Sequence, residues 1–94
     1  MIAILAKMQV KPGSESKFEE AMLHLVEQVN AHEPGNRLYT LCKEPEGRYV
    51  VMELYDNEDA MTAHMQSEHV KASGPSFKGL MSGRPEFVRM DVLG

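Results

Sequence analysis

Residues 49–55 limit the folds open to this chain more than any other segment. Side chains alternate sides along a β-strand, and here both sides are apolar apart from one carboxylate and the tyrosine hydroxyls. One side carries Val50, Met52 and Leu54, and the other carries Tyr49, Val51, Glu53 and Tyr55. A soluble chain rarely leaves a large apolar face open, so this strand predicts a sheet that is covered on both faces.

Three further segments alternate in the same way, and two helical segments separate them. The strands are predicted at residues 2–10, 37–44 and 87–93. The first helix is expected after Ser14 or Ser16, with Ser16 and Glu19 spaced as a capping box, and it ends before Pro34. The second follows Asp56 or Asn57, with a second piece capped by Ser67 and an interruption at residues 73–75 that suggests a mobile flap.

The resulting order, β-α-β-β-α-β, predicts a ferredoxin-like α+β fold as one domain over residues 1–94. Two helices would cover one face of a four-stranded antiparallel sheet, which leaves the other face apolar. We expect two subunits to pack sheet to sheet, as a homodimer. The alternative is that long side chains and the C-terminal segment cover this face within one subunit.

Composition excludes several classes of protein. A net charge of −4 on 94 residues argues against binding to nucleic acid or to anionic membrane surfaces. The single cysteine, Cys42, cannot form an intrachain disulfide, and its place in a strand favours a small buried hydrophobe. No stretch resembles a transmembrane span, and the N-terminus lacks a basic lead-in, so we expect a cytoplasmic protein.

Glu53 and His64 are the residues most suited to acid–base chemistry. Glu53 is the one carboxylate in the strand at 49–55, where burial is costly without a partner. His64 lies among small residues at helical spacing, Ala60, Ala63 and Ser67, which leave room beside the ring. We expect the two to line one pocket under the helices. A solvent-facing or interfacial Glu53 and a packed core histidine are the alternatives.

His69 follows His64 by five residues. On one continuous helix the two rings would point about 140° apart, so a shared metal site is not predicted. His69 is expected at the surface, or at the pocket rim if the helix breaks at Ser67.

Several short motifs occur in an order that resembles the antibiotic biosynthesis monooxygenase family. The chain has residues 10–13 (Val-Lys-Pro-Gly) after the first strand, then Phe18, and residues 33–36 (Glu-Pro-Gly-Asn) followed by Tyr39 and Leu41. The remaining matches are Glu53, Tyr55, Ala60, His64, His69 and Pro85. The resemblance covers nearly the whole chain and implies a ferredoxin-like subunit that dimerises into an α+β barrel.

The resemblance also implies an activity. Members of the family include oxidoreductases that oxygenate phenolic or quinol substrates without flavin, haem or metal. On that basis His64 would accept a proton, Glu53 would hold its ring, and Asn36, Tyr55 and His69 would contact the substrate. Haem degradation is not expected, because Lys71 to Gly74 supply no histidine. The chain also has no tryptophan, whereas the family often has one at the position of Tyr55.

Two other functions remain open from the sequence. One is isomerisation of a small hydroxy-ketone or sugar-phosphate-like metabolite by the same pair, for which Arg84 or Arg89 would have to reach the pocket. The other is a non-catalytic binding or stress protein, for which side chains would fill the pocket.

Overall fold

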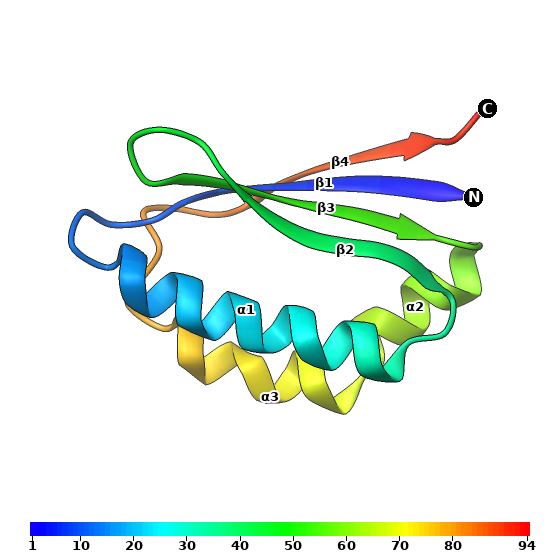
Figure 1. Ribbon diagram of the computed structural model, residues 1–94, viewed down its shortest axis with the longest axis horizontal. Helices are drawn as coiled ribbons and strands as arrows, with labels where there is room; N and C mark the ends of the chain where they lie inside the picture. Colours follow the sequence, from blue (N-terminus) through cyan, green and yellow to red (C-terminus); the bar gives the residue numbers. More distant parts are fainter.

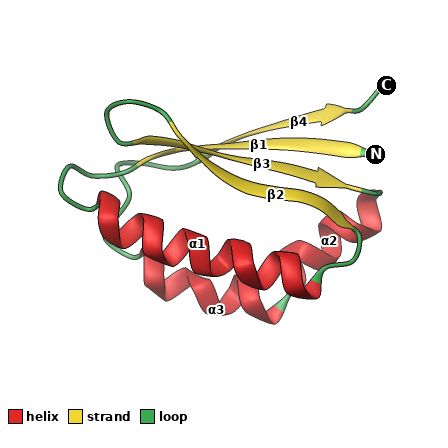
Figure 2. Cartoon of the chain, in the orientation of Figure 1, coloured by secondary structure: helices red, strands yellow, loops and turns green.

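The computed structural model describes all residues from 1 to 94 and has three helices on one face of a four-stranded sheet (Figures 1 and 2). The elements are β1 (Ile2–Gln9), α1 (Glu15–His32), β2 (Asn36–Lys43), β3 (Arg48–Tyr55), α2 (Glu58–Gln66), α3 (Glu68–Phe77) and β4 (Glu86–Asp91). The strand order is β2-β3-β1-β4, and every neighbouring pair is antiparallel. The predicted ferredoxin-like fold is confirmed, with the second helix divided into α2 and α3.

The register decides which side of β3 faces the helices. Glu53 pairs with Ile4 on β1 and with Tyr39 on β2, and all three side chains are buried. Tyr49, Val51 and Tyr55 lie on the same side and are also buried. Glu53 therefore points under the helices rather than toward the open face of the sheet.

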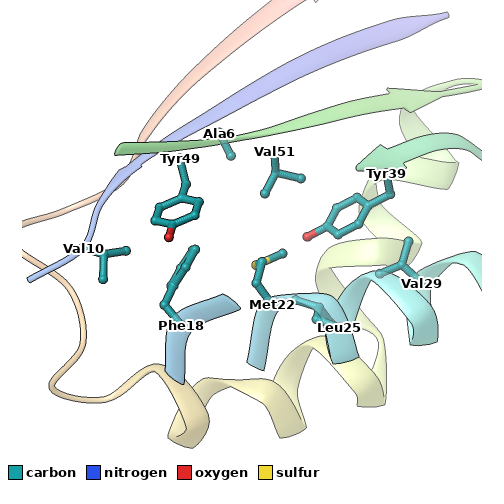
Figure 3. Close-up of a cluster of buried hydrophobic side chains, with 9 residues drawn as sticks. All are labelled: Ala6, Val10, Phe18, Met22, Leu25, Val29, Tyr39, Tyr49 and Val51. Carbon is teal, nitrogen blue, oxygen red and sulfur yellow. The ribbon is translucent and has the colours of Figure 1, made fainter. Parts of the chain in front are cut away.

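The main core lies between this side of the sheet and α1 (Figure 3). The Phe18 ring lies 4.7 Å from the ring of Tyr49, centroid to centroid, and is fully buried. Burying such a side chain stabilises the fold by about 1.5–3 kcal/mol. Nine buried residues form the cluster: Ala6, Val10, Phe18, Met22, Leu25, Val29, Tyr39, Tyr49 and Val51.

The helix ends differ in part from the sequence prediction. α1 begins at Glu15 after Ser14, so the capping box predicted at Ser16 is wrong. The caps at Asn57 and Ser67 are as predicted: the side chains accept from the N–H groups of Ala60 and Val70. The predicted interruption at residues 73–75 is also wrong, because α3 runs through to Phe77 with Pro75 inside it.

The second face of the sheet stays open within one chain. Leu38, Met52 and Met90 each remain about 40% exposed on this face, and the C-terminal Leu93 is almost fully exposed rather than folded over it. The sheet-to-sheet homodimer remains a prediction. None of the helices has the length and apolarity needed to cross a bilayer.

Candidate functional site

A cavity of about 580 Å³ lies between the sheet and the helices. Fourteen of its seventeen lining residues are hydrophobic, and Glu53 and His64 are the acidic and basic side chains among them. The common hollow expected from the sequence is therefore present. No lysine or arginine lines it, and Arg89 instead pairs with Glu58 at the surface.

Glu53 is held by a neighbour on its own strand. The Tyr55 hydroxyl donates a hydrogen bond of 2.5 Å to Oε1 of Glu53, within the buried part of the site. Burial raises the pKa of Glu53, while the Tyr55 hydrogen bond and the nearby His64 oppose that rise. Glu53 thus lines the cavity as a carboxyl group whose proton is harder to remove than usual.

The carboxylate that binds the His64 ring is Glu33, not Glu53. Nδ1 of His64 lies 2.9 and 3.0 Å from the two oxygens of Glu33. The ring packs between Tyr39 and Tyr55, with centroid separations of 5.1 and 5.6 Å. With a carboxylate as its partner, Nδ1 carries a hydrogen. In the neutral form of the ring Nε2 is then the bare nitrogen, and the ring lines the cavity. The expectation that Glu53 holds this ring and its tautomer is wrong.

Glu33 accepts hydrogen bonds from three side chains. It is the C-cap residue of α1, and besides His64 it accepts from Nε2 of His69 and, at 3.2 Å, from Nδ2 of Asn36. Burial alone would raise the pKa of Glu33, but the hydrogen bonds from His69, Asn36 and His64 lower it below its ordinary value. Glu33 is therefore held as a carboxylate.

The break between helices α2 and α3 at Ser67 explains why the side chains of His64 and His69 both reach the carboxylate of Glu33. Ser67 has extended backbone angles, φ −69° and ψ 150°, between α2 and α3. His69 thus starts a new helix and turns toward Glu33, instead of pointing about 140° away as on a continuous helix. It does not line the cavity; it lines a groove of about 650 Å³ on the outer side of α1 and α3.

The other predicted contact residues take different places. Tyr55 lines the cavity, but its hydroxyl is engaged by Glu53. Asn36 is not part of the lining, and its amide supports Glu33 from the turn that joins α1 to β2. Tyr39 extends from β2 into the space above α1 (Figure 3) and lines the cavity. Burial raises the pKa of Tyr39, so its hydroxyl remains a donor.

The match to known families extends over most of the chain. Residues 1–74 match the family model described as antibiotic biosynthesis monooxygenase. This chain belongs to that family. A Bacillus subtilis relative named "Putative monooxygenase YcnE" is 30% identical, and the match covers 98% of this chain and 98% of the relative.

Solved structures of similar proteins agree with the assignment to the antibiotic biosynthesis monooxygenase family. A Caulobacter crescentus structure described as a "putative antibiotic biosynthesis monooxygenase" has 34% identity and a TM-score of 0.95, covering 99% of this chain and 90% of its own. Rv0793 from Mycobacterium tuberculosis is 20% identical with a TM-score of 0.89, covering 99% and 95%. That second likeness concerns the fold alone.

Sequence reasoning missed the role of Glu33 in this family member. Residues 33–36 were expected to end the helix and to form one of the family motifs, with no role for Glu33 itself. The sequence nevertheless contains a signal for that role. A carboxylate at the C-terminus of a helix faces the negative end of the helix dipole, so it needs nearby donors or positive charge. Such a residue is therefore a candidate for a site carboxylate that hydrogen-bond donors hold in place.

Proposed function

We propose that this chain is a cofactor-independent monooxygenase acting on a small phenolic or quinol compound. The observation that carries the proposal is the pair formed by Glu33 and His64 at the edge of an apolar cavity. Glu33 fixes the proton on Nδ1 of His64, at 2.9 Å, and this leaves Nε2 to accept a proton.

The first step would be removal of a phenolic proton by Nε2 of His64. The ionised carboxylate of Glu33 then stabilises the imidazolium that forms. The electron-rich substrate anion reduces oxygen by itself, so the protein need only bind, orient and desolvate it. A hydroquinone and O₂ together contain the atoms and electrons of a hydroxyquinone and one water molecule, so this step needs no outside reductant.

Tyr39 is the side chain best placed to orient the substrate oxygen. It lines the cavity next to His64, and its raised pKa keeps its hydroxyl protonated. A donor beside the base favours the phenolate as it forms. Apolar side chains such as Met61, Phe77 and Phe87 line the same cavity and suit an aromatic ring.

The test is oxygen uptake with a panel of hydroquinones by the wild type and His64→Gln. Loss of the base should reduce kcat/KM by about 10²–10⁴-fold. His24→Gln, at an exposed position on α1, controls for the loss of an imidazole. Unchanged rates in folded His64→Gln would remove His64 from the mechanism. Turnover of a hydroxy-ketone without oxygen uptake would instead support the isomerase.

A further inference from the structure

We propose that Glu33, His64 and His69 bind one zinc-class divalent metal ion, and that this ion blocks the proton acceptor of the site. Each residue offers one ligand atom, and the three atoms lie within 4.8 Å of one another. They come from three different elements: the C-cap of α1, the last turn of α2 and the first turn of α3. The three side chains are 8–13% exposed, so the cluster is largely shielded from solvent.

The three ligand atoms already converge on one small region. Both imidazoles contact Oε2 of Glu33, with Nδ1 of His64 at 2.9 Å. Zinc bonds of about 2.0–2.2 Å in a tetrahedron place neighbouring ligand atoms about 3.4 Å apart. An entering ion therefore has to separate Nδ1 of His64 from Oε2 of Glu33 by about 0.5 Å, and it has to draw together those ligand atoms that lie further apart, up to 4.8 Å.

The donor set selects the class of metal. Two imidazole nitrogens and one carboxylate oxygen suit zinc and its first-row neighbours, whereas calcium and magnesium prefer sites made of oxygen alone. Three protein ligands also leave a position for water.

The surroundings supply support for the ligands. Asn36 Nδ2 donates to Oε1 of Glu33, as outer-shell groups do for ligating carboxylates. The other amide atom, Oδ1 of Asn36, is buried and lacks any donor.

An ion can reach the cluster without crossing the substrate cavity. His69 lines the groove outside α1 and α3, while His64 lines the cavity inside. Glu33 connects the two rings. The metal site thus opens on a different side of the helical layer from the site of the chemistry.

Metal binding has a defined effect on His64. A metal on Nδ1 displaces the proton there, and the neutral ring then carries its proton on Nε2. His64 would then be a donor where the proposed oxygenation needs an acceptor. This inhibitory effect rests on the proposed function, whereas binding itself does not.

The experiment is isothermal titration of chelator-treated protein with ZnCl₂, together with the visible spectrum of the Co²⁺-loaded protein. We expect one zinc ion bound per chain. The Co²⁺-loaded protein should show the visible absorption bands of a cobalt ion with few ligands, all of them nitrogen or oxygen. His69→Gln and Glu33→Gln should each weaken zinc binding by about 100-fold or more, since even outer-shell changes cost about 10–100-fold. His24→Gln, which alters a histidine of the same groove outside the cluster, should bind as the wild type does.

Three results would overturn the proposal. These are no stoichiometric uptake by the wild type, His69→Gln binding as tightly as the wild type, or His24→Gln losing as much affinity as His69→Gln. Circular dichroism melting of each variant verifies folding, and His69→Gln tests the site even if Glu33→Gln unfolds. A metal-binding protein with no oxygen uptake would refute the proposed function and leave the metal site intact.

Discussion

A Cβ atom added at Gly35 would lie 2.7 Å from the Cβ of Ala60. The turn after α1 therefore packs against the first turns of α2 with no room for a methyl group. This contact keeps Glu33, two residues before Gly35, close to His64, one turn after Ala60. Gly35→Ala should cost about 1–3 kcal/mol in the free energy of unfolding, because the two segments must move apart.

The same contact allows a compensating change. Ala60→Gly alone should destabilise α2 by about 1 kcal/mol. Combined with Gly35→Ala it removes the clash, so the double variant should be more stable than the sum of the single changes predicts, by about 0.5–3 kcal/mol. Urea unfolding of the four proteins measures this coupling, and strictly additive effects would contradict the close contact.

Glu33 should matter more than Glu53 for the state of the His64 ring. Glu33→Gln removes the charge that favours Nδ1–H, and we expect kcat/KM to fall by about 10²–10⁴-fold. Glu53→Gln keeps a hydrogen-bond acceptor for Tyr55 and should leave the His64 tautomer unchanged. Nitrogen-15 NMR of the histidine rings measures which ring nitrogen of His64 carries the proton. A tautomer change in Glu53→Gln but not in Glu33→Gln would contradict our assignment.

Periodicity predicts the sheet and the residues that share a side with Glu53, but it leaves open whether that side faces the helices or a partner subunit. The alternating pattern of β3 placed Glu53 on the same side as Tyr49, Val51 and Tyr55, and the register confirms it. Strand alternation is a local property, so one sequence reveals it.

Periodicity could not identify Glu33 as the partner of His64. Glu33 lies 31 positions away, and the contact depends on how α1 ends over α2. The direction of His69 depends on the break at Ser67, which the sequence allowed but did not require. These are tertiary relationships, which local periodicity does not encode.

Glu53 should make the stability of the chain depend on pH. Burial raises its pKa in the folded state above the unfolded value of about 4.3. Its contribution is therefore fully favourable below about pH 4 and is lost as pH rises through the folded pKa. Glu53→Gln should gain stability relative to the wild type as pH rises, by about 1.4 kcal/mol for each unit of the shift.

Urea unfolding at pH 4, 6 and 8 measures this effect. Glu27→Gln, at an exposed position on α1, controls for the loss of one negative charge. A difference between Glu53→Gln and the wild type that stays constant across this range would show that Glu53 is not desolvated.

The open face of the sheet should be the surface between two subunits. Met52 lies near its middle, paired with Leu5 on β1 and Thr40 on β2, and is 40% exposed. A lysine there would bring a charge into an apolar contact, so Met52→Lys should elute as a folded monomer where the wild type is a dimer. Light scattering after size-exclusion chromatography gives the mass. Leu23→Lys, at a position 55% exposed on α1, should stay dimeric, and a monomeric wild type at micromolar concentration would refute the homodimer.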